Sequence, residues 1–220
     1  MKNHGMNPYL PSWEYVPDGE PHVFGKRVYI YGSHDRFAGY AFCQNDYVCW
    51  SAPVDDLTDW QYEGIIYTRA EAAHNEDGRQ CLYAPDVTCG PDGRYYLYYA
   101  LNETSAISVA VCDTPAGKYT YYGDVHYPDG TTLGARPGDE QQFDPGVLTE
   151  GETTWLCLKD KTDIAAAEDR QLPVFHGKNI LAINQYLAGS RRIQSTNQVE
   201  QCAFAGAGFA NDRHIFAFRH

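Results

Sequence analysis

The sequence predicts an all-β protein made of repeated four-stranded antiparallel sheets, the architecture of a β-propeller. In three places a carboxylate beside a proline opens an apolar strand, and these acids are Glu20, Asp86 and Asp144. They are 66 and then 58 residues apart, a period that suits one small sheet per repeat. Before residue 160 no apolar stretch keeps the 3.6-residue period of a helix. Because each repeat places its acid at the same point of its sheet, we expect the acids to gather around one axis.

Each of the first two units carries the signals of four strands, bounded by Gly, Pro and Asp. The strand that begins at the acid is joined to a second strand by a short turn that contains glycine. A further hairpin supplies the third and fourth strands of the unit. The predicted strands of the first unit cover residues 20–24, 28–33, 47–53 and 60–66. Those of the second cover 85–88 and 95–100, then 107–117 with its turn, and 118–125. Four antiparallel strands about every 60 residues are typical of a propeller blade.

The third unit is looser, with predicted strands at residues 144–148 and 154–157. After about Cys157 the strand signature stops, and 17 of the 18 tyrosines lie before residue 130. We therefore predict propeller blades with catalytic-type carboxylates over residues 1–157 and a divergent or irregular segment over residues 158–220. Within that segment, the alanine-rich residues 163–170 are a candidate short helix, and residues 195–210 show no clear period.

Composition narrows the class of protein. A chain of 220 residues with 43% apolar content is long enough for one sizeable domain with its own core. The net charge of −12 argues against nucleic-acid binding, which needs a basic surface. The sequence contains no apolar run of 18 residues and no secretory signal, so we expect no membrane span and a cytoplasmic location.

Two residue types have unusual distributions. The seven cysteines are scattered without a CxxC pair, which indicates reduced thiols rather than a disulfide framework or a zinc site. The 18 tyrosines and 4 tryptophans suit contacts with a wet ligand such as a sugar, although tyrosine is also a good strand residue. We expect most of the tyrosines to serve the strands.

Several motifs together resemble glycoside hydrolase family 43. They are NPYLP, PDGEPHVF, YGSHD, YAPDV and FDPGVL, at residues 7–11, 17–24, 31–35, 83–87 and 143–148. The resemblance covers about residues 7–157. It implies a five-bladed β-propeller, here with about three recognisable blades, and an enzyme of the xylosidase or arabinofuranosidase type. Such enzymes cleave O-glycosidic bonds of pentose- or galactose-containing saccharides with inversion, so the expected partner is an oligosaccharide or a plant cell-wall saccharide.

The resemblance also implies catalytic roles. The general base of the family is an Asp before Pro in the first blade, and the matching residue here is Glu20, with Asp18 as a second candidate. Asp18 would share a strand face with Glu20 if the strand already began there. The second-blade aspartate, which tunes and orients the acid, matches Asp86, although a structural role at the start of its strand stays open. Inversion needs two carboxyls about 6.5 to 9.5 Å apart in different surroundings.

The candidate substrate-binding residues surround these acids. Asp144 either binds sugar hydroxyls or caps its strand, and His34 and Asp35 either reach the sugar or close a turn. Trp13 and Tyr83 are candidate stacking platforms, and so is Trp50, for which core packing is the stronger interpretation. No metal is assigned: propellers of this family often hold a calcium ion, which leaves a structural calcium open, but no ligand spacing here specifies one. No other cofactor is expected.

One expected element is missing from the sequence. The general acid of the family is a Glu followed by a strand of the Gly-x-Tyr-Tyr-Leu type, and no such run follows residue 157. Glu200 is the nearest formal substitute, although its downstream strand is poor. We hypothesise that the sequence after about residue 157 is a truncated or frame-altered replacement for the remaining blades. The alternative to an active enzyme is therefore an inactive propeller fragment that binds carbohydrate or a protein partner.

Overall fold

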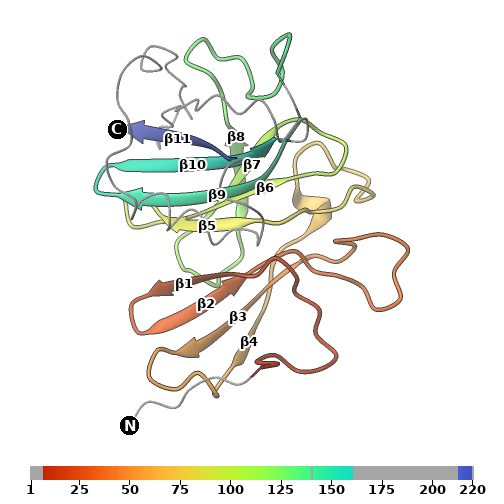
Figure 1. The fold of residues 1–220 in the computed structure, drawn as a ribbon, viewed down its shortest axis with the longest axis vertical. Coiled ribbons are helices and arrows are strands. Elements are labelled where there is room, and N and C mark those ends of the chain that lie inside the picture. The colour runs from red at the N-terminus through yellow and green to blue at the C-terminus, as the bar shows by residue number, and fades with distance from the viewer. Residues whose placement is uncertain (1–6, 140, 161–212, 220) are drawn as a thin grey trace.

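The computed structural model describes residues 7–139, 141–160 and 213–219, and their strands form three separate antiparallel sheets (Figure 1). The first sheet has the order β1-β2-β3-β4 and the second the order β5-β6-β7-β8. The third has the order β11-β10-β9. The described residues contain one helical element, the 3-10 turn η1 (Arg69–Glu71). The all-β prediction and its division into repeated sheets are therefore confirmed.

The strand bounds follow the sequence pattern closely. All eight strands predicted for the first two units are present, with ends shifted by a few residues. The first sheet consists of β1 (Glu20–Phe24), β2 (Arg27–Tyr31), β3 (Tyr47–Pro53) and β4 (Gln61–Tyr67). The second consists of β5 (Asp86–Cys89), β6 (Tyr95–Ala100), β7 (Ile107–Cys112) and β8 (Thr120–Asp124).

The third sheet is built from β9 (Gln142–Glu150), β10 (Thr153–Asp160) and β11 (Arg213–Arg219). The strand β11 pairs antiparallel with β10, although it lies in the segment that the sequence pattern left without assigned strands. The candidate helix at residues 163–170, the unassigned stretch 195–210 and Glu200 lie outside the described residues.

Glycine permits the tight turn at the start of each sheet. The hairpins β1–β2, β5–β6 and β9–β10 contain Gly25, Gly93 and Gly151 with φ of 62°, 81° and 60°. This left-handed backbone is unfavourable for a residue with a Cβ atom. The glycines that punctuate the sequence therefore set the first hairpin of each repeat.

Two hydrophobic cores lie between the sheets. One packs the first sheet against the second and the other packs the second against the third. Tyrosine fills much of this volume: among the described residues, seven tyrosines are less than 2% exposed, namely Tyr31, Tyr47, Tyr67, Tyr96, Tyr98, Tyr99 and Tyr119. Most of their hydroxyls make hydrogen bonds, as buried polar groups generally do. The Tyr31 hydroxyl donates to the Pro115 carbonyl at 2.7 Å, and those of Tyr67 and Tyr99 are 3.0 Å apart.

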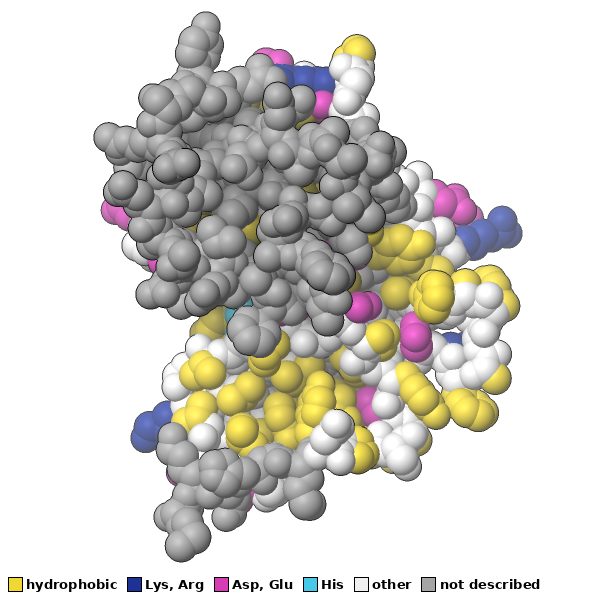
Figure 2. Space-filling model, in the orientation of Figure 1, with side chains coloured by type: hydrophobic (Ala, Val, Ile, Leu, Met, Phe, Trp, Pro, Cys, Tyr) yellow, Lys and Arg dark blue, Asp and Glu magenta, His cyan; other side chains and the backbone are white. Residues whose placement is uncertain are grey.

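The face of the first sheet that turns away from the second keeps apolar side chains at the surface. Val23, Tyr62 and Ile65 are exposed by 62%, 51% and 45%. Figure 2 shows hydrophobic side chains gathered over this part of the molecule. Among the described residues, no helix approaches the length and apolar character that crossing a membrane requires.

Candidate active site

The first strands of the three sheets lie side by side (Figure 1). Between β5 and β9, Asp86 bonds to Val147 and Thr88 to Thr149, each pair being 61 residues apart. The equal offset means that these two strands run in the same direction. Between β1 and β5, the side chain of His22 bonds to Asp86. The three strands that carry an acid at or near their start therefore meet at one inner edge of the molecule.

Asp86 is the centre of this meeting point. It is the first residue of β5 and only 4% exposed. Its Oδ1 accepts hydrogen bonds from the backbone N–H of Val87 at 2.7 Å and from Nε2 of His22 at 2.5 Å. Its Oδ2 accepts one from the backbone N–H of Val147 at 2.6 Å. One carboxylate thus bonds to all three sheets.

Glu20 lies on β1, two residues before His22. It is the first residue of the strand and half-buried, and the burial of β1 alternates so that Glu20, His22 and Phe24 share the less exposed face. Burial opposes charge on His22, but the attraction and hydrogen bond of Asp86 and the charge of Glu20 outweigh it and raise the pKa of His22. Glu20 of the first sheet and Asp86 of the second therefore both raise the pKa of the same imidazole, that of His22.

Asp18 differs from Glu20 in its local structure. The strand β1 begins only at Glu20, and Asp18 has a left-handed φ of 53°, so the condition for a shared strand face is not met. Asp18 is exposed, and its Oδ2 accepts a hydrogen bond from the Ser33 hydroxyl at 3.0 Å. The structure therefore turns Asp18 toward the end of β2 rather than along β1.

A second group of predicted residues gathers around the Cys43 thiol. Burial raises the pKa of Cys43 to about 12, and the negative charges of Asp35 and Asp18 act in the same direction. Burial also raises the pKa of Tyr83, with smaller contributions from Cys43, Cys81 and Asp144. Residues before or near the start of the inner strands are therefore within electrostatic reach of one another. Asp144 reaches this place with a left-handed φ of 45° inside β9.

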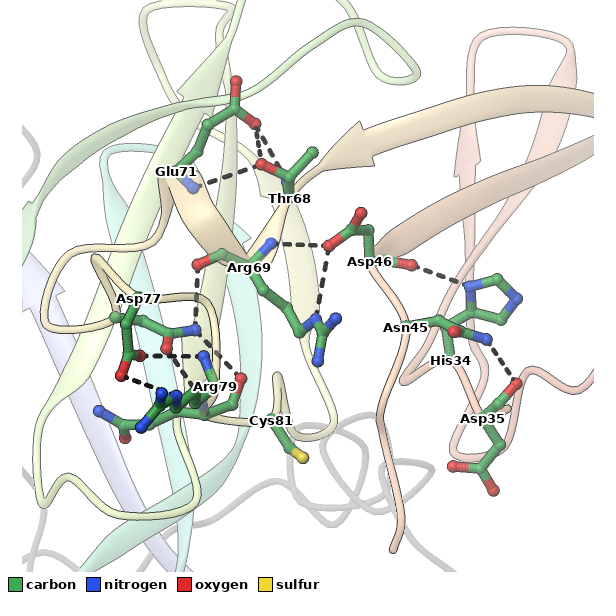
Figure 3. Close-up of polar contacts among 12 residues, drawn as sticks. His34, Asp35, Asn45, Asp46, Thr68, Arg69, Glu71, Asp77, Arg79 and Cys81 are labelled. Carbon is green, nitrogen blue, oxygen red and sulfur yellow. Dashed lines mark hydrogen bonds and ion pairs between the residues drawn. The ribbon is translucent and has the colours of Figure 1, made fainter. Parts of the chain in front are cut away.

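His34 and Asp35 make structural contacts in the loop before β3 (Figure 3). His34 uses both ring nitrogens, one with the Asp46 carbonyl at 2.9 Å and one with Glu14 Oε1 at 2.8 Å. The carboxylate of Asp35 accepts from the Cys43 backbone N–H at 2.7 Å. These bonds match the turn-closing interpretation of both residues. Their contact with a sugar stays a prediction.

Figure 3 also shows how this loop is joined to the chain before β5. The carboxylate of Asp46 accepts a hydrogen bond from the Arg69 backbone N–H at 2.8 Å. Arg69 opens η1, which Thr68 and Glu71 cap reciprocally. The loops of the first and second sheets near the site are therefore tied together.

Glu14 joins Trp50, one of the tryptophan candidates, to this loop. Its side chain is 5% exposed and accepts from His34 and, at 3.0 Å, from the indole N–H of Trp50. Trp50 is 5% exposed, which agrees with a packing role, whereas Trp13 is 66% exposed with its ring 6.1 Å from that of Trp50. Trp13 therefore stays the candidate with a free aromatic face for stacking.

Sequence reasoning missed His22 and Glu14. The alternation of β1 carried a signal for His22, because a residue two positions after Glu20 lies on the same face. No local pattern marks Glu14, since its partners are 20 and 36 residues away. Among the described residues, no group of three or more His, Cys, Asp or Glu side chains could hold a metal ion.

Comparison with known proteins identifies the class of molecule that carries this site. The model of glycosyl hydrolases family 43 matches residues 14–181, and the chain belongs to this family. A xylosidase/arabinosidase of Thermoclostridium stercorarium is 70% identical over 156 residues, which are 71% of this chain and 33% of that protein. One of Bacteroides ovatus is 37% identical over 125 residues, which are 50% of this chain and 36% of that protein. The chain thus spans about a third of the length of these curated relatives.

Solved structures of the same family share the fold. A family 43 arabinoxylan arabinofuranohydrolase from Bacillus subtilis has a TM-score of 0.57 at 22% identity, over 83% of this chain and 42% of that one. A family 43 β-xylosidase/α-arabinofuranosidase from a compost metagenome has a TM-score of 0.55 at 21% identity, over 83% of this chain and 60% of that one. The three described sheets therefore form part of a family 43 propeller, and the family resemblance read from the motifs is confirmed.

Proposed function

We infer that this chain carries the part of a family 43 glycosidase active site that holds the general base. The proposed reaction is hydrolysis of O-glycosidic bonds of pentose-containing saccharides with inversion of configuration. The observation that carries this proposal is the meeting of Glu20 and Asp86 at the inner edge, linked through His22. Asp86 is buried and bonded to three sheets, whereas Glu20 is half-buried at the start of its strand. Two acids in such different surroundings suit different tasks at the same pH.

Glu20 takes the role of general base in this proposal. Its carboxylate removes a proton from water as the water attacks the anomeric carbon, and the bond to the leaving oxygen breaks on the opposite side of the sugar. Asp86 supplies fixed negative charge beside the reacting centre. The proton for the leaving group comes from a general acid to which the proposal assigns no residue, and Glu200 lies outside the described residues.

The names of the relatives support the substrate class. Those of Thermoclostridium stercorarium and Bacteroides ovatus are called xylosidase/arabinosidases, and a Thermotoga petrophila relative, 26% identical over 169 residues, is called an extracellular endo-α-(1→5)-L-arabinanase. Their shared element is a pentose at the cleaved bond. We propose that xylose or arabinose occupies the site beside Glu20, with Trp13 and Tyr83 as candidate stacking surfaces and Asp18, His34, Asp35 and Asp144 as polar neighbours.

The test is hydrolysis of aryl glycosides of xylose, arabinose and galactose by the purified chain. Aryl leaving groups need little protonation, so turnover does not depend on the unassigned acid. We expect hydrolysis of at least one pentoside, with the first product formed in the inverted configuration by proton NMR. Retention of configuration would contradict the assignment of Glu20 as a base.

Matched variants separate the two base candidates. We expect Glu20→Gln to lower kcat by about 10²- to 10⁴-fold, the contribution of a general base. Asp18→Asn should have a much smaller effect if Asp18 only binds Ser33. Asp113→Asn, at an exposed carboxylate directly after β7, is the control for replacing a carboxylate by an amide. Sugar binding without turnover in the unaltered chain would support an inactive carbohydrate-binding propeller instead.

A further inference from the structure

His22 is held in one position by its neighbours. Its ring stacks on that of Phe24, with centroids 5.8 Å apart and planes within 7°, and lies 6.1 Å from the ring of Tyr31. Its side chain is 24% exposed, while that of Asp86 is 5% exposed. A side chain whose ring is packed on two sides loses little further freedom when it bonds to a partner.

The hydrogen bond from His22 to Asp86 differs in kind from the other two hydrogen bonds that the Asp86 carboxylate accepts. The N–H groups of Val87 and Val147 belong to the backbone and fix the carboxylate to β5 and β9. The third donor is the imidazole of His22, at 2.5 Å, and it belongs to the strand that carries Glu20. This bond is therefore a direct side-chain connection from Asp86 to the strand that carries Glu20.

We propose that His22 is a positioning residue that fixes the distance between Glu20 and Asp86 by bonding to Asp86 from the Glu20 strand. Residues two positions apart on a strand are separated by about 6.5 to 7 Å, so the anchor lies close to the base. An error of about 1 Å in the place of a catalytic group can cost about 100-fold in rate. This inference rests on the proposed function, because it concerns how the same two acids are held.

The charged and titratable groups that face His22 are Glu20 from its own strand, Tyr31 from β2 and Asp86 from β5. Both acids attract a proton to the imidazole, so the connection is an ion pair at pH values below the pKa of His22. The pair persists below the pKa of His22 and weakens as the pH rises through it. A positioning role of this kind has a pH signature that a space-filling role lacks.

The first arm of the test needs no turnover. NMR titration of the imidazoles in the full chain, with the signals of its eight histidines assigned by variants, gives the pKa of His22. We expect that pKa to lie above those of the exposed histidines and to fall in Asp86→Asn, but not in Asp124→Asn. A His22 pKa that Asp86→Asn leaves unchanged would overturn the proposal.

The second arm measures kcat and KM on the aryl pentoside that the unaltered chain hydrolyses. We expect His22→Ala to lower kcat by about 10- to 100-fold with little change in KM. His22→Gln keeps an N–H donor and should recover part of the rate, while the alkaline limb of its kcat profile should shift. The matched control is His74→Ala, which removes the histidine of another His–Asp pair away from the inner edge.

The two arms distinguish the inference from the function on which it rests. If His22→Ala and its control have equal kcat and the alkaline limb stays in place, His22 does not position the acids. If the unaltered chain hydrolyses none of the glycosides, the proposed function fails, and the imidazole titration still decides whether His22 holds Asp86.

Discussion

The molecule contains two histidine–aspartate pairs of the same chemistry in different places. His22 and Asp86 are 2.5 Å apart at the inner edge, with side chains 24% and 5% exposed. His74 and Asp124 are 2.8 Å apart, with side chains 48% and 11% exposed. His74 belongs to the loop before β5, and Asp124 ends β8.

The partners of each aspartate explain what the pair does. Asp124 also accepts from the Ser108 hydroxyl of its own sheet, so the outer pair ties a loop to the sheet beside it. Asp86 also accepts from backbone N–H groups of two sheets and from His22 of a third. The same pair of residue types therefore fastens a loop at the outer edge and joins whole sheets at the inner edge.

The largest effect on stability is expected at Asp86. Asp86→Asn leaves one acceptor oxygen for three donors and places an amide NH₂ opposite a buried N–H. It should therefore lower the free energy of unfolding by about 2–4 kcal/mol. Asp124→Asn, in the more exposed pair, should cost about 1 kcal/mol. Urea unfolding of both variants measures the contrast. Equal losses would remove the distinction between the two edges.

The sequence predicted the repeated sheets but not the hydrogen bonds that join one sheet to the next. Glu20 and Asp86 are the first residues of their strands, as predicted, whereas Asp144 is the third residue of β9. A carboxylate can satisfy N–H groups at the start of a strand, and glycine permits the turns that follow. Which donors reach Asp86 depends on Val147 and His22, which are 61 and 64 residues away. Contacts at such separations leave no local periodicity in a single sequence.

The strand β11 shows the same limit. Arg213–Arg219 pairs with β10 more than 50 residues before it. Tyrosine-rich repeats with turn residues between them mark the strands of the first two sheets, and β11 belongs to no such repeat. Its partner could be found only in three dimensions.

A hydroxyl chain at the inner edge should show the next largest effect. Thr149 bonds to Thr88 of β5 at 2.9 Å and to Thr154 of β10 at 2.8 Å. Thr149→Val removes both bonds and should cost about 1–2 kcal/mol. Thr58→Val, at an exposed turn of the first sheet, should stay within about 0.5 kcal/mol. Thermal unfolding of both variants tests this, and a larger loss at Thr58 would reverse the comparison.

The smallest stability effect should depend on pH. Because the pKa of His22 is raised in the folded state, its pair with Asp86 contributes fully below the ordinary histidine value of about 6.5. That contribution is lost as the pH rises through the folded-state pKa. The stability difference between the unaltered chain and His22→Gln should therefore be larger at about pH 5.5 than at about pH 8.5. The opposite trend, measured by urea unfolding, is the result that argues against an ion pair.

The central claim is that the inner edge, and not the outer one, carries the chemistry. The most direct measurement is kcat, on the aryl pentoside that the unaltered chain hydrolyses, for Glu20→Gln at the inner edge and Glu152→Gln at an exposed turn of the third sheet. The account predicts a loss of about 10²- to 10⁴-fold at Glu20 and a change below about twofold at Glu152. An unchanged rate in Glu20→Gln would contradict it.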